Sequence, residues 1–394
     1  MRKIRNVLLG WKGGLSDFLF DRLEPAAASY RKSLKKTVFI GITGSCGKTT
    51  TKELTAAVLK SRGPATATRG DRNTLPQFIK TILRTFPFHR AAVFEMAAYG
   101  PGTLDRGIAV VAPSIAVVTQ VGLDHYSAFR SREAVAAEKS KLVAALPPTG
   151  VAVLNADDPF VLAMGEQTQA RKILFSASSP DADLWASNIR SPWPERLTFT
   201  VHTKDGAFPV ETKLCGKHWV TAVLAALGTA LALSIPLEDA LPPLASLEPP
   251  ALRMSPLYLG RDITVIRDDC KAPYLSVPSC LEFLAEARAK RKILILGTLS
   301  DYPGDSSSKY KAVVREGLKA VDEIYMVGPL RTSTPEKFRN TAFGGRVRGF
   351  DGLPSLARHL GETAGPGDLI LVKGSEDADR LHRLVDILKQ RFPS

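Results

Sequence analysis

The sequence predicts an α/β protein built from a doubly wound domain with a phosphate-binding loop and a second, smaller α/β domain. Two observations support this prediction. Near-continuous apolar runs alternate with helical patterns from residue 37 onward, which is typical of parallel strands buried on both faces. The first of these runs leads into a glycine-rich loop, and the alternation starts again after about residue 250.

Length, charge and cysteine spacing restrict the functional class. The 394 residues suffice for two or three domains. Lys and Arg outnumber Asp and Glu by 53 to 39, which favours anionic partners. Because the basic residues form no stripe interleaved with aromatics, nucleic acid is not expected. The four cysteines show no CxxC spacing, which favours a reducing, cytoplasmic environment, and no apolar run predicts a transmembrane helix.

Residues 1–36 form a basic N-terminal segment. It carries nine Lys or Arg and three Asp or Glu, with "VLLGW" and "DFLF" between them. This pattern predicts one or two short amphipathic helices. Such helices either pack on the main body or make a peripheral contact with an anionic membrane or a partner.

Residues 37–248 are predicted as the first α/β domain. A hairpin is expected at 196–214 and a helix at 218–233. Residues 234–250 contain five prolines and are predicted to be a linker or domain edge. The expected strands lie in "TVFIGITG", "AAVFEMA", "SIAVVTQVG", "GVAVLNADD" and "KILFSA".

Residues 249–394 are predicted as a second, Rossmann-like α/β domain. Its expected strands lie in "ITVIRDD", "KILILGTLS", "EIYMVGP" and "DLILVKGS". No internal repeat is evident.

The loop after the first strand predicts a nucleotide site. Gly44 and Gly47 allow the backbone N–H groups to turn inward onto phosphate oxygens, and a helix follows directly. Lys48 can reach the terminal phosphates, and the Thr49 hydroxyl can bind magnesium. Strand, loop, "GKTT" and amphipathic helix together indicate nucleotide binding more strongly than the glycines alone.

The motifs, taken in order, resemble the Mur ligase family of ATP-dependent amide ligases, and within it the MurF branch. The similarity covers about residues 37–390 and lacks the usual N-terminal UDP-sugar-binding domain, since only forty residues precede Gly41. The segments that carry it are "TGSCGKTTT", "TRGDRNTLPQFIKTIL", "VFEMAAYGPGTLD", "VTQVGLDHYSAFRSREAVAAEKSKLV", "GVAVLNADDP", "LCGKHWVTAVLAA", "DDCKA" and "LVKGS".

The resemblance implies a reaction in which ATP phosphorylates a carboxylate and an amine attacks the acyl phosphate. It implies two Mg²⁺ ions held by Thr49, Glu95, His125 and Lys139, with Lys139 in the role of a carbamylated lysine. On the helix expected here, Lys139 and Lys141 point about 200° apart, so Lys141 is expected to face solvent. It also implies nucleotide contacts from Gly44, Ser45, Cys46, Gly47, Lys48, Thr49, Thr50, Asn155, Trp219, Arg253, Asp268 and Asp269. Substrate contacts are expected from Thr68, Asp71, Arg72, Asn73, Lys373 and Ser375, and Lys48, His125, Lys139 and Lys271 are expected to be catalytic. Lys271 would complete the positive site on domain closure.

Several positions depart from the family pattern. Trp219 and Ala222 replace two amides of the adenine pocket, so Trp219 either stacks on the base or belongs to the core, and base selectivity is open. The glutamate expected at Thr103 is missing, and Glu376 reverses a charge. With the short N-terminus, these changes point away from a UDP-muramoyl substrate.

Three functional hypotheses follow. The first is an ADP-forming ligase that joins a small-molecule carboxylate without a UDP-muramoyl group to an amine. The second is a MurF-type peptidoglycan-precursor ligase whose sugar is held by residues 1–36 or a partner. The third is a nucleotide-binding pseudo-ligase without activity, which the retention of both expected metal positions disfavours.

Overall fold

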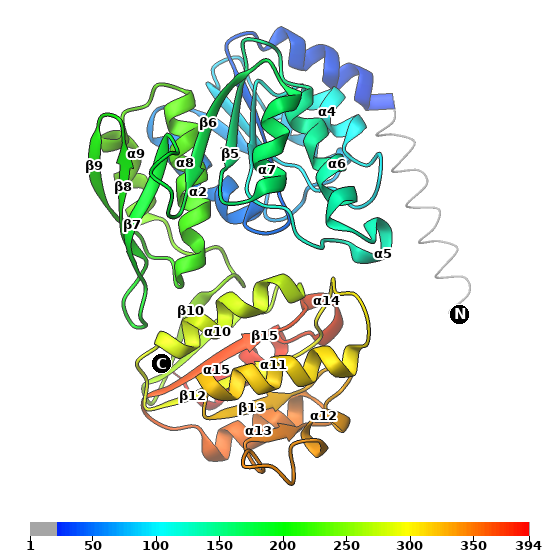
Figure 1. The fold of residues 1–394 in the computed structure, drawn as a ribbon, viewed down its shortest axis with the longest axis vertical. Coiled ribbons are helices and arrows are strands. Elements are labelled where there is room, and N and C mark those ends of the chain that lie inside the picture. Colours follow the sequence, from blue (N-terminus) through cyan, green and yellow to red (C-terminus); the bar gives the residue numbers. More distant parts are fainter. Residues whose placement is uncertain (1–21, 394) are drawn as a thin grey trace. The chain divides into compact units, whose positions relative to one another are not determined.

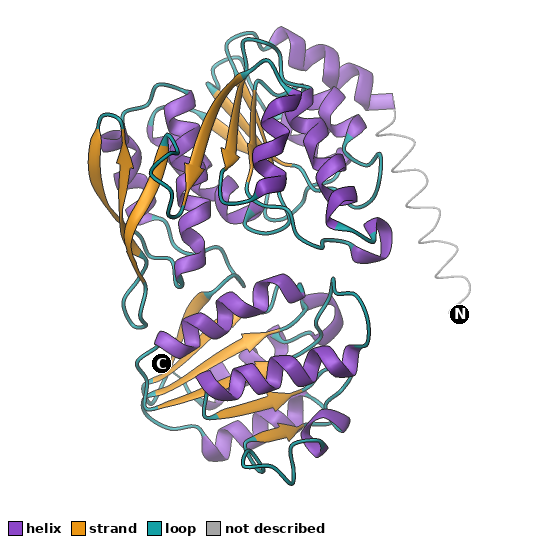
Figure 2. Ribbon diagram, viewed as in Figure 1, coloured by secondary structure: helices purple, strands orange, loops and turns teal. Residues whose placement is uncertain are grey.

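The computed structural model describes residues 22–393, and their packing divides them into two units. The first unit contains the described residues up to Ser187, with 201–208 and Thr221–Leu244. The second contains Asn188–Thr200, Pro209–Val220 and the residues from Ala245 onward. Figure 1 traces the chain, and Figure 2 shows strands flanked by helices in each part. The α/β architecture predicted from the sequence is confirmed.

A nine-stranded sheet has the order β2-β3-β1-β4-β5-β6-β7-β8-β9. Its strands from β2 to β7 pair in parallel, and β3, β4 and β5 are buried along their whole length, as the apolar runs predicted. Only Lys204 and Asp205 separate β8 from β9, which form the expected hairpin. The strands are β1 Val38–Thr43, β2 Ala65–Ala67, β3 Ala91–Glu95, β4 Ile115–Val118, β5 Val151–Asn155, β6 Arg171–Ser176, β7 Leu184–Arg190, β8 Thr198–Thr203 and β9 Gly206–Glu211.

Helices cover this sheet and bury its apolar faces. A first helix spans residues 22–33. α2 packs on β2 and β3, α3 on α4, and α6 on α7, which lies beside it in Figure 1. The core includes Phe94, whose ring stacks on that of Phe39 and meets that of Phe78 edge-on. The helices are α2 Lys48–Ser61, α3 Leu75–Leu83, α4 Asp105–Val111, α5 Tyr126–Phe129, α6 Arg132–Ala144, α7 Pro159–Met164, α8 Val220–Ala232 and α9 Leu237–Ser246, with 3₁₀ turns at Gly165–Gln167 and Lys217–Trp219.

The proline-rich segment 234–250, predicted as a linker or domain edge, contains the helix α9, and the boundary between the two units falls within it, between Leu244 and Ala245. α9 includes Pro242 and Pro243. Leu237, Ala240 and Leu244 are buried at spacings of three and four, which gives one apolar helical face. The carbonyls that the two prolines leave without an N–H belong to the exposed residues Glu238 and Asp239, where water can reach them. Burial on one face therefore outweighs the turn signal of the prolines.

The second unit contains a six-stranded sheet of order β10-β11-β15-β12-β13-β14. β10 is antiparallel to β11, and the other pairs are parallel. Its core gathers apolar residues from the strands and from α13 and α15. The strands are β10 Ser255–Leu259, β11 Ile263–Asp268, β12 Arg291–Leu296, β13 Glu323–Met326, β14 Val347–Gly349 and β15 Asp368–Lys373. The helices are α10 Val277–Glu286, α11 Ser306–Ala320, α12 Ser333–Glu336, α13 Leu353–Thr363, α14 Glu376–Asp379 and α15 His382–Arg391, with a 3₁₀ turn at Tyr274–Ser276.

None of the helices in the described chain combines the length and the apolar character that a membrane span requires. The predicted amphipathic segment 1–36 is seen only in part, as the helix over 22–33, and residues 1–21 lie outside the described residues.

Candidate active site

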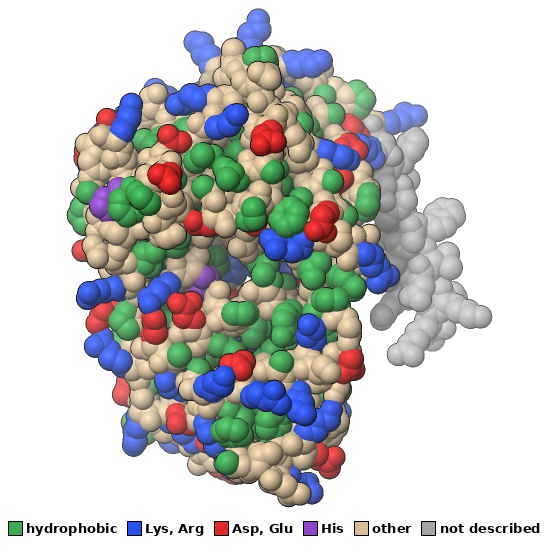
Figure 3. Space-filling view, viewed as in Figure 1, with side chains coloured by type: hydrophobic (Ala, Val, Ile, Leu, Met, Phe, Trp, Pro, Cys, Tyr) green, Lys and Arg blue, Asp and Glu red, His purple; other side chains and the backbone are tan. Residues whose placement is uncertain are grey.

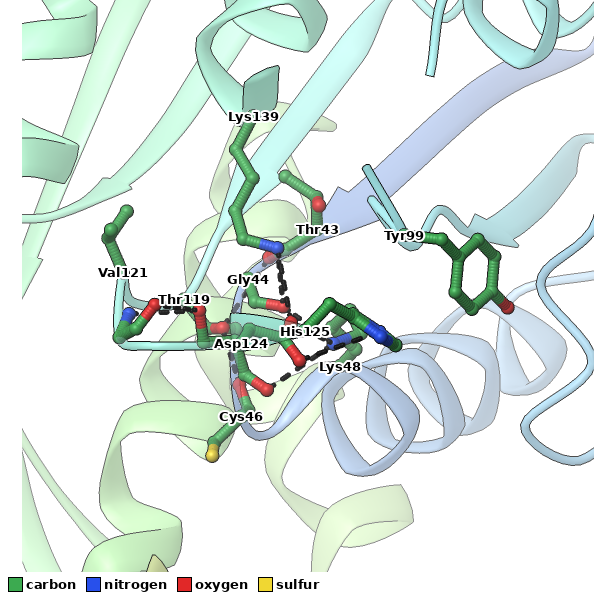
Figure 4. Close-up of polar contacts among 12 residues, drawn as sticks. Thr43, Gly44, Cys46, Lys48, Tyr99, Thr119, Val121, Asp124, His125 and Lys139 are labelled. Carbon is green, nitrogen blue, oxygen red and sulfur yellow. Dashed lines mark hydrogen bonds and ion pairs between the residues drawn. The ribbon is translucent and has the colours of Figure 1, made fainter. Parts of the chain in front are cut away.

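The loop between β1 and α2 requires glycine at two positions. Gly44 has a φ of 145°, and a Cβ there would lie 1.9 Å from the Thr119 hydroxyl. Gly47 has a φ of 81°, a left-handed conformation that side chains rarely adopt. The Thr119 hydroxyl donates to the Cys46 carbonyl over 2.6 Å. Close packing against β4 thus fixes the loop, as Figure 4 shows.

The helix after the loop begins in a form suited to an anion. α2 starts at Lys48, no side chain caps its N-terminus, and its first turn contains no acidic residue. The positive end of the helix and its unpaired N–H groups therefore face the loop without a competing carboxylate. The Lys48 ammonium folds back onto the carbonyls of Gly44, at 2.6 Å, and Ser45, at 3.4 Å.

Asp124 lies among three cationic or ionisable side chains (Figure 4). Its Oδ2 is 3.8 Å from Lys48 Nζ and 3.4 Å from Lys139 Nζ, and its Oδ1 is 3.6 Å from His125 Nε2. Burial alone would raise the pKa of Asp124, but Lys48, Lys139 and His125 outweigh it and lower the pKa. Asp124 is therefore held as an anion between the two lysines.

Lys139 is fully buried and reaches the phosphate loop. Its Nζ donates to the Gly44 carbonyl over 3.3 Å. Burial and the nearby Lys48 lower the pKa of Lys139 to about 8, although Asp124 acts in the opposite direction. Lys141, two residues further along α6, instead forms ion pairs with Asp105 and Glu138 at 2.9 Å each. The two lysines thus point in different directions, as their helical spacing predicted.

Glu95 is the last residue of β3, and only one of its two carboxylate oxygens accepts a hydrogen bond from the described residues. Asn73 Nδ2 donates to Glu95 Oε1 over 2.8 Å, and the Glu95 backbone N–H donates to the Thr68 hydroxyl over 3.1 Å. Glu95 Oε2 is buried and has no hydrogen-bond partner among residues 22–393. The structure therefore connects Thr68 and Asn73 of the expected substrate loop directly to Glu95. Asp71 is partly buried and Arg72 is exposed on the same loop.

Tyr99 lies beside this group. Its hydroxyl donates to Asn73 Oδ1, and its ring meets the His125 ring edge-on at 5.1 Å. Burial, together with Glu95, Asp71 and Asp124, raises the pKa of Tyr99 to about 12, so the phenol stays protonated and remains a donor. His125 directly precedes α5 and has a φ of 48°. The expected histidine is thus placed within reach of Asp124 and Tyr99.

Lys52 connects α2 to the loop that carries Thr68 and Asn73. Its side chain is completely buried. Its Nζ donates to the carbonyls of Thr68, at 2.8 Å, and Gly70, and lies 2.8 Å from Glu53 Oε1. A buried ammonium needs such partners, and these restrict the position of the loop.

Magnesium fits the donor set as an ion held mainly by phosphates. Within the described part of the chain, no three His, Cys, Asp or Glu side chains come together as a metal-binding group. Mg²⁺ usually takes one or two carboxylates together with substrate phosphates, so it does not need such a group. The free oxygen of Glu95 is a suitable oxygen donor, and Thr49, the expected hydroxyl ligand, lies in the first turn of α2.

The remaining first-unit positions are less directly connected to the loop. Asn155 Nδ2 donates to the Thr119 carbonyl over 2.7 Å, so it supports the residue that packs on the loop. Ser45 shares hydrogen bonds with Gly122 at 3.2 and 2.9 Å. Thr49 is buried at the start of α2, and Ala222 is buried on α8.

The second unit carries the other predicted residues. Asp268 Oδ2 accepts from Lys373 Nζ over 2.5 Å, and the Arg267 guanidinium holds Asp269 over 3.0 and 2.7 Å. Lys271 is exposed, and Arg253 and Ser375 are partly buried. These carboxylates already have cationic partners inside the unit.

Trp219 is buried in the same unit and its neighbour His218 is partly buried, and the Trp219 indole N–H has no partner among the described residues. Burial lowers the pKa of His218 to about 4, opposed by Asp268 and assisted by Lys373. A neutral histidine therefore belongs to this interior.

Sequence reasoning did not identify Asp124, Lys52, Tyr99 or Glu138. Glu138 is buried and accepts from the backbone N–H groups of Gly102 and Leu104 over 2.8 Å each. An acidic residue directly before His125 was the available signal for Asp124. The buried roles of Lys52 and Glu138 depend on contacts 16 and more residues away, which no local pattern reveals.

Two domain profiles match the sequence. The Mur ligase middle domain matches residues 42–230, and the Mur ligase glutamate ligase domain matches residues 252–376. Both lie within the chain segments that were predicted as two α/β domains.

Curated relatives and solved structures are similar over most of the chain. The UDP-N-acetylmuramoyl-tripeptide–D-alanyl-D-alanine ligase of Mycobacterium tuberculosis is 32% identical over 361 residues, which are 86% of this chain and 70% of that protein. The Escherichia coli protein of the same name is 29% identical over 73% of this chain and 64% of its own length. MurF from Acinetobacter baumannii gives a TM-score of 0.83 at 24% identity, over 93% of this chain and 80% of that one. MurF from Thermotoga maritima, solved in complex with ADP, gives 0.82 at 21% identity, over 94% and 84%.

Proposed function

This chain belongs to the Mur ligase family and is an ATP-dependent amide-bond ligase, and from this premise we propose that it converts a carboxylate to an acyl phosphate and transfers the acyl group to an amine. The observation that carries the proposal is the cluster around Asp124. It places two lysines and a histidine beside a loop whose backbone is shaped for phosphate.

In the proposal, different residues contribute to different parts of phosphoryl transfer. The α2 N-terminus and Lys48 hold the terminal phosphates, because transfer through a loose transition state needs positioning and positive charge more than covalent help. Glu95 and Thr49 would hold Mg²⁺ together with phosphate oxygens, and the ion would supply positive charge to offset the negative charge that must approach the carboxylate. Asn73 keeps Glu95 in one orientation and leaves its second oxygen available.

Lys139 and His125 complete this side of the site in the proposal. The lowered pKa leaves a part of the Lys139 amine neutral near pH 7. A neutral Nζ can add carbon dioxide and lose a proton, which gives a carbamate with oxygen ligands in place of a cation. His125 is the other predicted metal ligand on this side of the site, and it lies between Asp124 and Tyr99.

The proposal also concerns which carboxylic acid is the substrate. The expectation of an acid without a UDP-muramoyl group finds no support in the comparisons, because the relatives described above are named for UDP-N-acetylmuramoyl-tripeptide and D-alanyl-D-alanine. That pair is therefore the first to test. One observation favours testing another acid as well: the bulky side chain of Tyr99 contacts Asn73 and His125, beside the expected substrate loop.

A phosphate-release assay with ATP separates the candidates. Turnover with UDP-muramoyl-tripeptide and D-alanyl-D-alanine would identify a peptidoglycan-precursor ligase. Turnover only with other carboxylate–amine pairs would identify a different acid. Tight ATP binding without turnover for any pair would contradict the proposed ligase and favour the non-catalytic alternative.

A further inference from the structure

The turn that joins α3 to β3 exposes large apolar side chains. Phe86 is 50% exposed, Phe88 is 64% exposed, and Leu83 at the end of α3 is 41% exposed. The Phe86 and Phe88 rings stack with centroids 5.6 Å apart, and the His89 ring stacks on both. Single exposed apolar residues are ordinary, whereas a contiguous group of them indicates an interaction site.

Hydrogen bonds from three other segments hold this turn in place. The Tyr30 hydroxyl donates to the Thr85 carbonyl over 2.9 Å, and the Thr37 hydroxyl donates to the His89 carbonyl over 2.7 Å. The Arg90 N–H donates to the Pro64 carbonyl over 2.8 Å. The exposed rings are thus presented on a defined surface, and their exposure is not the result of a frayed chain end.

Basic residues adjoin, along the chain, the residues that form and hold this turn. Lys35, Lys36, Arg84 and Arg90 are exposed, and they make no ion pair with an acidic side chain of the described residues. The sequence has no Asp or Glu between Glu24 and Glu53 or between Asp71 and Glu95. Figure 3 shows Lys and Arg side chains gathered over the upper end of this unit, where the strands β5 and β6 begin in Figure 1.

We propose that these residues, Leu83, Arg84, Phe86, Phe88, Arg90, Lys35 and Lys36, form an aromatic–basic patch that binds the surface of an anionic lipid bilayer. Apolar side chains that enter the headgroup region and cations that attract anionic lipids act together at such surfaces. A nucleic acid fits less well, because the aromatic faces that would stack on bases are stacked on each other.

The position of the patch is compatible with an active enzyme on the membrane. Arg90 directly precedes β3, whose other end is Glu95, and Lys36 lies just before β1, whose other end leads into the phosphate loop. Strands rise about 3.3 Å per residue, so the six residues of β1 separate the patch from the loop by about 20 Å. Membrane binding through the patch therefore leaves the phosphate loop uncovered.

Sedimentation with vesicles tests the proposal on the full chain. The protein is expected to bind phosphatidylcholine vesicles that contain phosphatidylglycerol, to bind pure phosphatidylcholine weakly, and to lose binding as salt is added. The Phe86→Ser/Phe88→Ser double variant should bind at least about tenfold more weakly. Lys35→Gln/Lys36→Gln should lose about fivefold per charge, since each surface cation contributes roughly that factor.

Matched controls are available on the same unit. Leu162 is 44% exposed on α7, and Lys204 is exposed between β8 and β9, so Leu162→Ser and Lys204→Gln change similar groups elsewhere. These controls should bind like the unsubstituted chain. Equal binding by the Phe86→Ser/Phe88→Ser variant, equal binding to both kinds of vesicle, or no binding to either would overturn the proposal.

A second measurement reports on insertion itself. A tryptophan at position 88 (Phe88→Trp) should be quenched by brominated lipid in anionic vesicles, whereas Leu162→Trp should not. Absence of quenching at both positions would contradict insertion. The proposal would also be overturned if a single-stranded oligonucleotide bound as tightly as the vesicles and its binding depended on the same phenylalanines. Phosphate release without lipid should be unchanged in the serine variants, so this test is independent of the proposed ligase activity.

Discussion

The buried ammonium of Lys52, on the helix that follows the phosphate loop, donates to the carbonyl of Thr68 over 2.8 Å. Thr68 in turn accepts from the backbone N–H of Glu95. One side chain thus joins the nucleotide-binding helix to the segment that positions the expected metal ligand.

We expect Lys52→Met to destabilise the protein by about 1–3 kcal/mol, because it leaves the buried Thr68 carbonyl without its charged donor. The loosened loop should also raise the KM for the carboxylate more than the KM for ATP. Urea unfolding and steady-state kinetics measure the two effects. Lys141→Met on α6 is the control, since Lys141 is partly exposed, and similar losses in both variants would contradict the argument.

Lys48→Ala should reduce kcat by about three orders of magnitude or more while the fold survives, because it removes the cation that faces the terminal phosphates. Phosphate release measures kcat, and circular dichroism checks the fold. Lys60→Ala changes an exposed lysine in the last turn of the same helix and should leave kcat unchanged. Normal turnover in Lys48→Ala would refute the mechanism.

Carbamylation of Lys139 should depend on pH. The pKa of about 8 means that, at a fixed concentration of dissolved carbon dioxide, the reactive neutral amine increases as pH rises from 7 through 8 and levels off about one pH unit above the pKa. Labelled bicarbonate should then give a carbamate signal in carbon NMR that rises over the same range. Asp124→Asn should move the rise to lower pH, because Asp124 holds the Lys139 pKa up. Lys139→Ala should remove the signal and Lys141→Ala should keep it.

His218 should make stability depend on pH. Its pKa is lowered from 6.5 in the unfolded chain to about 4 in the native protein, so the unfolded state takes up the proton first. The free energy of unfolding that depends on His218 is therefore at its full value above pH 6.5 and decreases as the pH falls toward 4. At 1.36 kcal/mol per pH unit, the decrease between pH 6.5 and 5 is about 2 kcal/mol.

Urea unfolding at several pH values measures this slope for His218. It should become shallower in His218→Asn, which cannot take up the proton. His202→Gln, at a partly exposed position on β8, should keep the slope. An unchanged slope in His218→Asn would show that other groups cause it.

The sequence allowed the architecture and the conformation of the phosphate loop to be predicted, because both depend on local patterns. Strands buried on both faces read as apolar runs, and Gly44 to Thr49 have a spacing that only one geometry explains. The direction of Lys139 followed from helical spacing relative to Lys141. Each of these signals lies within about ten residues of chain.

The rest depends on contacts between distant segments. Asp124 is placed by its contacts with two lysines on different helices. Lys139 lies 15 residues away in the chain, and Lys48 comes from the phosphate loop. The two prolines of α9 outweighed its apolar spacing in the prediction, although burial of Leu237 and Leu244 decides the structure. Only tertiary packing supplies this information.

Neighbouring residues on α6 reach two different loops: Glu138 holds the N–H groups of Gly102 and Leu104, and Lys139 contacts Gly44. Successive residues of an α-helix are rotated by about 100°, since one turn takes 3.6 residues. A one-residue insertion between Ser131 and Glu138 would therefore rotate both side chains away from their loops at once. This helix tolerates exchange of its exposed residues but not a change in its length, so natural insertions and deletions should be confined to its flanking turns.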